Sequence, residues 1–137
     1  GEPEKPLSKI ASGGELSRIM LAIKTVLAGS DAIGTLIFDE IDTGISGSAA
    51  QKVGEKLKEV SSTRQVICVT HSAQIAAYAD GHFFIRKQVQ KGRTFTNVQP
   101  LDFNERVQEL ARIMGGETVS ELMLKNAEEM LLQRTGS

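Results

Sequence analysis

The sequence contains few of the residues that build disulfide frameworks or aromatic binding surfaces. Its 137 residues include no Trp, one Tyr and one Cys. A single cysteine excludes a disulfide framework, and its place in the apolar run QVICVT predicts that Cys68 is packed in a core. The formal net charge of −1 gives the chain no overall attraction to nucleic acid or to an anionic membrane.

Long hydrophobic runs are also missing. No stretch approaches the roughly 18 apolar residues that a membrane-spanning helix needs. The first residues, GEPEKP, are polar and hold two prolines, which is unlike a signal peptide and typical of a linker. We therefore expect residues 1–6 to be a linker remnant, cut from something longer. The length and the 40% hydrophobic content fit one folded domain over residues 1–137.

The first half of the chain carries the pattern of a helix followed by a β-α-β unit. A first helix is predicted by apolar residues at helical spacing: Leu16, Ile19, Met20, Ile23 and Leu27. We expect this helix to be buried on much of its circumference and to stop near Gly29. The apolar runs TLIFDE and QVICVTH predict two strands, separated by a helix that Ser46 caps. Such strands are typical of a parallel unit covered on both faces.

The second half predicts a hairpin and two helices. A short helix is expected over residues 72–78. HFFIRKQ and RTFTNVQPL read as paired strands with KGR at the turn. A helix over residues 104–114 should stop at Gly115-Gly116, and the capping-box pattern Thr118-Val-Ser-Glu121 should open the last helix. The apolar face of that helix is expected to comprise Val119, Leu122, Met123, Met130 and Leu131. The fold class is therefore α/β, with a largely parallel sheet core, flanking helices and a terminal hairpin.

Both predicted parallel strands end in polar side chains. Asp39 and Glu40 follow the first strand, and His71 follows the second. In open parallel sheets, ligands bind at this carboxyl edge. Asp39 would then lie near Mg²⁺, usually through water, while Glu40 would polarise an attacking water and His71 would contact a γ-phosphate. Each residue alone also fits an ordinary solvated strand end, and that alternative stays open.

The stretch Ser12-Gly-Gly-Glu15 also has two interpretations. It fits a capping box, which satisfies amides at the start of a helix. The paired glycines suit an anion that approaches those amides closely. A phosphate loop is missing, because the G-x-x-x-x-G spacing of Gly29–Gly34 is followed by Thr35 in place of Lys and precedes a strand.

The strings ASGGE, LIFDE and VTH, in this order, resemble the second half of an ABC-type ATPase head. The longer strings KIASGGELSRIMLAIK, LIFDEIDTGISG, QVICVTHSAQIAAYADGHFFI and ELARIMGG resemble the C-terminal region of the RecN family of SMC-like DNA repair proteins, from about Leu7 to Leu132. The resemblance implies the C-terminal lobe of an ABC-type P-loop NTPase head. It also implies ATP hydrolysis in recombinational repair of double-strand breaks, in the bacterial cytoplasm at the nucleoid.

The resemblance assigns roles residue by residue. The signature motif, which binds the γ-phosphate of ATP on the opposite protomer, is matched by Ser12, Gly13, Gly14 and Glu15. Walker B is matched by Leu36 to Asp39, the catalytic glutamate by Glu40 and the switch histidine by His71. The D-loop region is matched by Asp42, Thr43, Gly44, Ile45 and Ser46. Two positions depart from the common pattern, with Ala11 in place of Leu and Ser46 in place of Asp.

Other parts that the resemblance implies fall outside this sequence. Walker A, the Q-loop and a long coiled coil would precede Gly1, so the fragment alone is expected to be inactive. The implied cofactors are ATP and Mg²⁺. The implied partners are the protein's own N-terminal Walker A half, a second head in a homodimer and DNA bound through the full-length protein, with no membrane.

Two alternatives remain. The chain could be a non-catalytic docking module, or a head fragment of another SMC or Rad50-like ATPase. The candidates for DNA contact are the basic residues around the hairpin, and an ordinary solvated turn is the open alternative for them: Arg86, Lys87, Lys91 and Arg93.

Overall fold

A computed structural model describes residues 11–27, 32–90, 93–116 and 118–135. It divides the chain into two compact units, unit 1 (Gly1–Tyr78) and unit 2 (Ala79–Ser137), and each is described by itself. Three features predicted from the sequence lie outside the described residues: the linker remnant 1–6, the helix stop at Gly29 and the basic residue Lys91.

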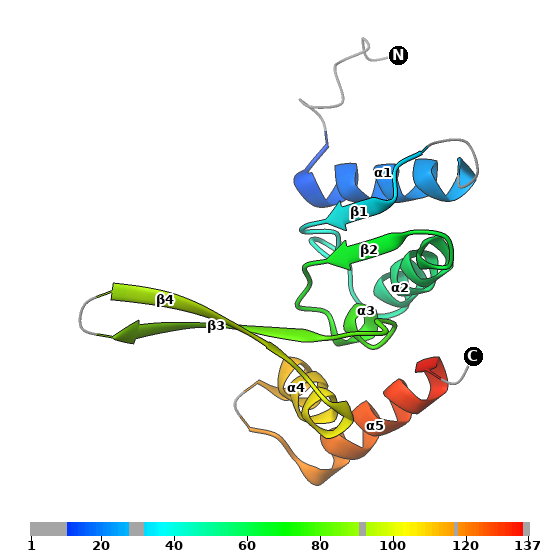
Figure 1. Cartoon of the computed structure of the whole chain (residues 1–137). Helices are drawn as coiled ribbons and strands as arrows, with labels where there is room; N and C mark the ends of the chain where they lie inside the picture. The colour runs from blue at the N-terminus through cyan, green and yellow to red at the C-terminus, as the bar shows by residue number, and fades with distance from the viewer. Residues whose placement is uncertain (1–10, 28–31, 91–92, 117, 136–137) are drawn as a thin grey trace. The chain divides into compact units, whose positions relative to one another are not determined.

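Unit 1 contains the predicted β-α-β arrangement. Its elements are α1 (Gly13–Val26), β1 (Thr35–Phe38), α2 (Gly47–Ser61), β2 (Gln65–Cys68) and α3 (Ala73–Ala76), shown in Figure 1. β1 and β2 pair in parallel, with a register that runs from Thr35↔Gln65 to Phe38↔Cys68. The parallel pair is confirmed, and the sheet has two strands among the described residues. A wider parallel core stays a prediction.

The core of unit 1 lies between the sheet and its helices. Alternate side chains of β1, Leu36 and Phe38, are buried, as the period of two in a strand requires. They join a cluster that is completed by residues of α1, the loop after β1, α2 and α3: Leu21, Ile41, Ala50, Leu57, Val60 and Ile75.

The other face of the sheet is open among the described residues. Ile37 is 70% exposed, Val69 is 50% exposed and Ile67 is 44% exposed. In α1 the buried residues are Gly14 and Leu21, whereas the predicted apolar stripe is largely exposed: Leu16, Ile19, Met20 and Ile23. The expectations of strands covered on both faces and of a helix buried on much of its circumference are therefore wrong for these residues. An apolar pattern marks side chains that favour burial, but it does not supply the surface that covers them.

The helix starts of unit 1 are mixed in outcome. Ser12 caps α1 with both hydrogen bonds of a capping box, as predicted. Ser46 occupies the N-cap position of α2, but its side chain makes no capping hydrogen bond, so the predicted capping role is wrong. Glycines with positive φ lie close by, Gly44 at 78° and Gly47 at 54°, and they turn the chain into α2.

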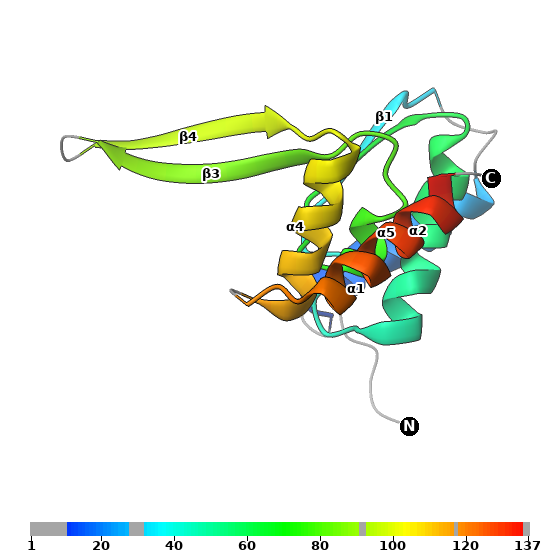
Figure 2. The same cartoon turned by 90° about the horizontal axis from the view of Figure 1, so that it is seen from below.

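Unit 2 pairs a long hairpin with two helices. β3 (Phe83–Gln90) and β4 (Arg93–Pro100) are antiparallel, from Phe83↔Pro100 to Gln90↔Arg93, which confirms the hairpin. The hairpin is not terminal, because α4 (Phe103–Gly115) and α5 (Glu121–Thr135) follow it and lie side by side in Figures 1 and 2. Four fully buried side chains join these helices: Leu110, Ala111, Ala127 and Leu131.

The ends of α4 and α5 refine the sequence reading. α4 ends at Gly115 before Gly116, whose φ is 71°, as the paired glycines predict. At the start of α5, Ser120 Oγ accepts a hydrogen bond from Met123 N at 3.3 Å, so the predicted box starting at Thr118 is wrong. The predicted face is also partly wrong, since Leu122 is 67% exposed and Val119 precedes the helix.

Candidate functional site

The N-terminus of α1 is closed by its capping box. Glu15 N donates to Ser12 Oγ at 3.3 Å, and Ser12 N donates to Glu15 Oε2 at 2.8 Å. The hydrogen bond from the Ser12 backbone, aided by the Ser12 side chain, lowers the pKa of Glu15. The box leaves the amides of Gly13 and Gly14 without a partner among the described residues. These amides lie at the positive end of the helix dipole.

The two glycines bring α1 against the loop that follows β1. A Cβ added at Gly14 would lie 2.7 Å from the carbonyl oxygen of Glu40 and 3.0 Å from atoms of Thr43. A Cβ added at Gly13 would lie 2.7 Å from Glu40 Oε2. The sequence suggested a ligand as the reason for paired glycines. The structure supplies a second reason, which is close approach of the chain's own loop.

Glu40 has an unusual backbone conformation. Its φ is 58°, and it is the one non-glycine residue with positive φ among those that the structure describes. The left-handed region costs a residue with a side chain about 1–2 kcal/mol. The turn is held by hydrogen bonds on both sides, from Glu40 N to Asp39 Oδ1 at 2.9 Å and from Thr43 N to Glu40 O at 3.0 Å. Strain of this kind is common at functional sites.

Two residues of α1 hold the same loop through its carbonyl groups. Ser17 Oγ donates to Asp39 O at 2.9 Å. Arg18 Nη1 donates to Ile41 O at 3.0 Å and to Thr43 O at 2.8 Å. Neither residue was predicted from the sequence. Their signal was a pair of polar side chains inside the otherwise apolar run ELSRIML.

Asp42 joins the ends of the two parallel strands. Asp42 is only 5% exposed. Its Oδ2 accepts hydrogen bonds from Thr70 Oγ1 at 2.7 Å and from His71 N at 2.9 Å. The same oxygen lies 3.2 Å from His71 Nδ1. Burial alone would raise the pKa of Asp42, but the hydrogen bonds from Thr70 and His71 outweigh it and hold the pKa below its usual value.

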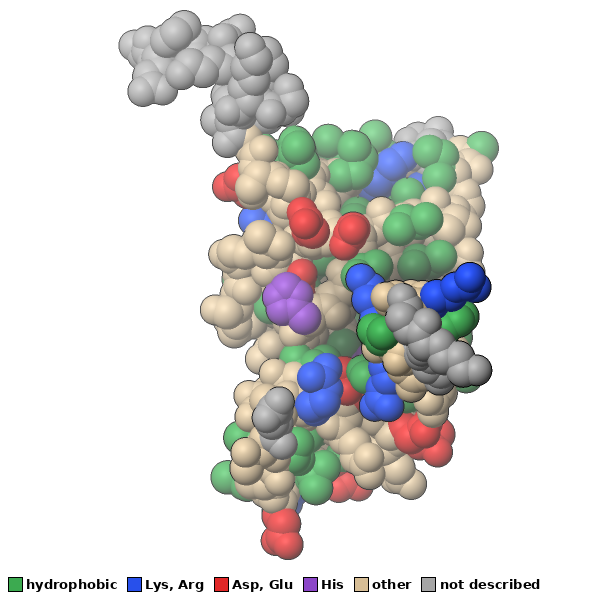
Figure 3. All heavy atoms as spheres, turned by 90° about the vertical axis from the view of Figure 1, so that its left-hand side faces the viewer, with side chains coloured by type: hydrophobic (Ala, Val, Ile, Leu, Met, Phe, Trp, Pro, Cys, Tyr) green, Lys and Arg blue, Asp and Glu red, His purple; other side chains and the backbone are tan. Residues whose placement is uncertain are grey.

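The imidazole of His71 is held at one side and open at the other. The side chain is 87% exposed, and a histidine is visible at the surface in Figure 3, close to acidic side chains. The structure thus places Gly13 and Gly14, which were predicted to belong to a signature motif, against Glu40, and it places His71 against Asp42. The remaining residues of the predicted D-loop region form the turn between β1 and α2, where Ile45 N donates to Asp42 O at 3.2 Å and Ile45 packs against the core.

The site offers few metal ligands of its own. Among the described residues there is no group of three or more His, Cys, Asp or Glu that could hold a metal ion. Asp39 is a single exposed carboxylate with one oxygen engaged by Glu40 N. This donor set fits Mg²⁺, which keeps several waters and takes phosphate oxygens as ligands, better than a metal that needs a protein cage.

Cys68 is not a candidate nucleophile. The thiol is partly buried on β2 and packs against the core, in line with the packing role predicted for it. Burial, with smaller contributions from Asp42 and Asp39, raises its pKa to about 12. The thiol therefore stays protonated at neutral pH, and protonated thiols react slowly.

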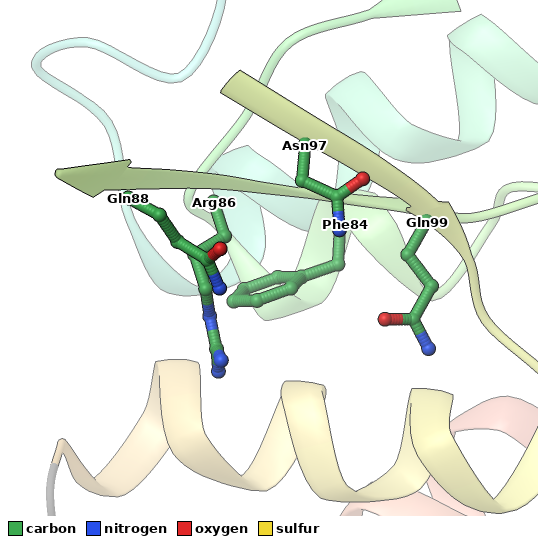
Figure 4. Close-up of a pocket in the computed structure, with 5 residues that line it drawn as sticks. All are labelled: Phe84, Arg86, Gln88, Asn97 and Gln99. Carbon is green, nitrogen blue, oxygen red and sulfur yellow. The ribbon is translucent and has the colours of Figure 1, made fainter. Parts of the chain in front are cut away.

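Unit 2 holds a shallow pocket on one face of the hairpin. A cavity of about 210 Å³ is lined by alternating residues of β3 and β4, shown in Figure 4: Phe84, Arg86, Gln88, Asn97 and Gln99. The Phe84 ring lies 5.5 Å from the guanidinium carbon of Arg86 and 5.9 Å from that of Arg112. Gln99 Nε2 donates to Glu105 Oε1 at 3.1 Å, so part of the lining is already engaged by α4.

The basic residues predicted around the hairpin do not form one surface. Arg86 pairs with Asn97 and its neighbour Lys87 pairs with Thr96, so these two side chains point to opposite faces. Arg93, opposite Gln90, shares the face of Arg86. The three described basic residues of the hairpin are therefore divided between its two faces. No described helix has the length and apolar character to cross a membrane.

Comparison with known folds supports the fold class. A solved structure from work on ATP-driven dimerization and DNA-stimulated activation of SMC ATPases matches with a TM-score of 0.56 and 24% identity, covering 86% of this chain and 70% of that chain. The chain thus has an α/β fold that it shares with an SMC ATPase. No family model matches it.

Comparison of sequences finds similar proteins over nearly the whole chain. The DNA repair protein RecN of Bacillus subtilis is 50% identical over 133 residues, which are 97% of this chain and 23% of that protein. RecN of Treponema pallidum and RecN of Deinococcus radiodurans are each 52% identical over 131 residues, or 96% of this chain and 23% of each relative. The predicted resemblance to RecN is therefore confirmed. The chain spans about a quarter of the length of these relatives.

Proposed function

We propose that this chain is the signature and Walker B part of a RecN-like ATPase head that acts in recombinational repair of double-strand breaks. One observation carries the proposal furthest: the glycines of the signature motif lie against the side chain and backbone of Glu40. The relatives that match nearly the whole chain are DNA repair proteins, and the fold is shared with an SMC ATPase.

In this proposal the N-terminus of α1 binds phosphate. The Gly13 and Gly14 amides donate to γ-phosphate oxygens of an ATP held by a second head, and the helix dipole favours the negative charge. Ser12 and Glu15 keep the helix start ordered through their capping box. Backbone amides and the helix dipole would therefore bind the phosphate at this motif without a lysine side chain.

The loop after β1 supplies the hydrolytic residues. Asp39 would hold Mg²⁺ through water, and the ion would neutralise charge on the β- and γ-phosphates. Glu40 orients the attacking water and accepts its proton as a general base. The exposed side of His71 would face the γ-phosphate. The backbone turn at Glu40, buttressed by α1, fixes where the carboxylate lies before substrate arrives.

The remaining parts of the site come from the rest of the complete protein. Three quarters of each relative lies outside the matched region, and unit 1 has an uncovered apolar face on β1, β2 and α1. We propose that the protein's own Walker A half covers this face and holds ATP. Two such heads would form a homodimer around two ATP molecules, and DNA would be bound by the full-length protein at the bacterial nucleoid. The 137-residue chain alone should not hydrolyse ATP, because it lacks the phosphate loop.

The test is Glu40→Gln in the complete protein. ATP turnover should fall by about 10²–10⁴, since a general base is lost, while ATP-bound head dimers accumulate. Turnover is measured by phosphate release and dimerisation by size-exclusion chromatography with light scattering. Glu128→Gln, on an exposed position of α5, is the matched control and should behave as the parent does.

An alternative proposal is a docking module without catalysis, and the exposed apolar face of unit 1 favours it. Unchanged nucleotide behaviour in Glu40→Gln would support that alternative and contradict the ATPase proposal. In that case Ile37→Glu, on the open face of β1, should still abolish association with the missing part of the protein.

A further inference from the structure

Asp42 differs from the other acids of the site in its burial. Glu40 and Asp39 are exposed to solvent, whereas only 5% of the surface of Asp42 is exposed. A buried carboxylate is costly unless it is hydrogen-bonded. Here the bonds from Thr70 and His71 converge on one oxygen, Oδ2. A residue that only had to end a turn would not need a buried charge.

We propose that Asp42 is a positioning residue for His71, which fixes the imidazole so that Nδ1 faces the protein and Nε2 faces the bound nucleotide. The proposal rests on the ATPase function proposed above and deepens it. Asp42 itself touches no reacting atom and acts through His71.

The geometry supports this role because His71 has little else to hold it. With its side chain 87% exposed, the ring would otherwise rotate among several orientations. The 3.2 Å contact between Nδ1 and Asp42 Oδ2 selects the orientation in which Nδ1 carries its proton. The opposite ring nitrogen, Nε2, then points away from Asp42 and is available to a ligand.

The anchor is itself held rigidly. The carbonyl groups on either side of Asp42, those of Ile41 and Thr43, both accept from Arg18. Thr70 Oγ1, which donates to Asp42, also accepts from Ser72 N at 3.0 Å. Both ends of the contact are therefore fixed, one to α1 and one to the turn after β2.

A structural role alone must be separated from positioning. Asp42 could merely tie the loop after β1 to the end of β2. Thr70→Val removes one bond to the same oxygen without touching the imidazole, so it is the matched control for the structural role. Asp42→Asn keeps the size of the side chain and an acceptor for Thr70, but it removes the charge that holds Nδ1.

The experiment is a double-mutant cycle in the complete protein. Asp42→Asn should lower kcat about tenfold with the KM for ATP little changed, as for other carboxylates that orient a functional histidine. In a His71→Ala background, Asp42→Asn should cause no further loss. Thr70→Val should lower thermal stability and leave kcat near the parent value. Asp42→Ser, which keeps a small acceptor, replaces the amide variant if that variant does not fold.

A spectroscopic readout separates this inference from the function on which it rests. In ¹⁵N-histidine NMR spectra, His71 should be the Nδ1–H tautomer in the parent and a mixture in Asp42→Asn. An unchanged tautomer, an unchanged kcat, or an equal loss in the His71→Ala background would overturn the inference. Turnover that survives Glu40→Gln would instead overturn the proposed ATPase function, while the tautomer measurement would still judge the Asp42–His71 contact.

Discussion

The two units of the molecule use polar groups in different ways. In unit 1, the loop between β1 and α2 is held by the buried carboxylate of Asp42 and by Arg18, which donates hydrogen bonds to two backbone carbonyl groups of the loop. In unit 2, the helices meet through apolar residues, and the capping box of Asp102 and Glu105 lies at an exposed helix start. Partly buried polar contacts that join distant segments are expensive to build, so their concentration around Glu40 and His71 supports the proposal that places the site in unit 1.

Among the described residues of unit 2, Arg106 is a buried polar group that serves as a contrast. Arg106 is 7% exposed and donates through Nη2 to Ala79 O at 2.7 Å. Burial lowers its pKa, and burial together with the charge of Arg106 lowers the pKa of His82. The bonds of Arg106 tie the start of unit 2 to α4. The two buried charges differ in their partners, because Asp42 contacts the exposed side chain of His71 whereas Arg106 contacts backbone carbonyl groups.

The largest effect should come from the apolar contact that defines unit 2. Leu131 is fully buried on α5, so Leu131→Ala should lower the free energy of unfolding of this unit by about 2–5 kcal/mol. Leu122→Ala, on the exposed side of the same helix, should change it by less than about 0.5 kcal/mol. Hydrogen exchange of α5 amides measures both. Equal losses of stability in Leu131→Ala and Leu122→Ala would contradict the assignment of Leu131 to the buried face of α5 and of Leu122 to its exposed face.

A smaller loss should follow from filling the contact between α1 and the loop of unit 1. Gly14→Ala places a methyl group against the Glu40 backbone, which cannot move aside, and should cost about 1–3 kcal/mol. Gly13→Ala meets the end of the flexible Glu40 side chain, so its cost in stability should be lower. It should instead displace the carboxylate and reduce turnover of the complete protein. If Gly13→Ala were the more destabilising of the two, this description of the contact would fail.

The clamp of Arg18 should contribute less than the packing. Arg18→Ala removes two hydrogen bonds to carbonyl groups and should cost roughly 1.5 kcal/mol, measured by denaturant unfolding of the complete protein. Arg18→Lys keeps the charge but not the planar guanidinium, so it should recover only part of that loss. Full recovery by lysine would show that charge alone matters at this position.

The smallest effect is a difference in pH dependence between the units. The folded-state pKa of His82 is lowered, so the stability that its neutral form gives unit 2 is present above about pH 6.5 and is lost as the pH falls. The folded-state pKa of Asp42 is also lowered, so its contribution to unit 1 persists until the pH falls below about 4.

Hydrogen exchange at pH 7 and pH 5 should therefore show loosening in unit 2 and little change in unit 1. His82→Gln should remove the difference. Loosening of unit 1 over the same range would contradict the assignment.

The sequence predicted the elements of unit 1 well, because their signals are local. The apolar runs around Leu36 and Val66 gave both strands, and Ser12 and Glu15 gave the start of α1. The bond between Asp42 and His71 spans 29 residues and depends on the parallel register, which no local pattern encodes. The residues assigned by resemblance are placed by the structure, whereas their chemical roles stay predictions.

The errors in the sequence reading have a common physical origin. Leu122 and the exposed stripe of α1 were expected to be buried because their spacing is helical and apolar. Spacing defines which side chains share a face, but the position of the neighbouring element decides which face is covered. The capping residue of α5 was misplaced for a similar reason, since Thr118 and Ser120 both fit a helix start and only the chain path selects Ser120.

The close contact between α1 and the Glu40 loop has a mechanical consequence. Packed protein contacts are nearly incompressible, so a force applied to one side is passed to the other with little loss. Gly14 touches the Glu40 carbonyl, and one turn further on Arg18 grips the carbonyls that flank Asp42. The first half of α1 and this loop should therefore move as one rigid unit. A displacement of the helix start at Ser12 should shift the carboxylate of Glu40 with it.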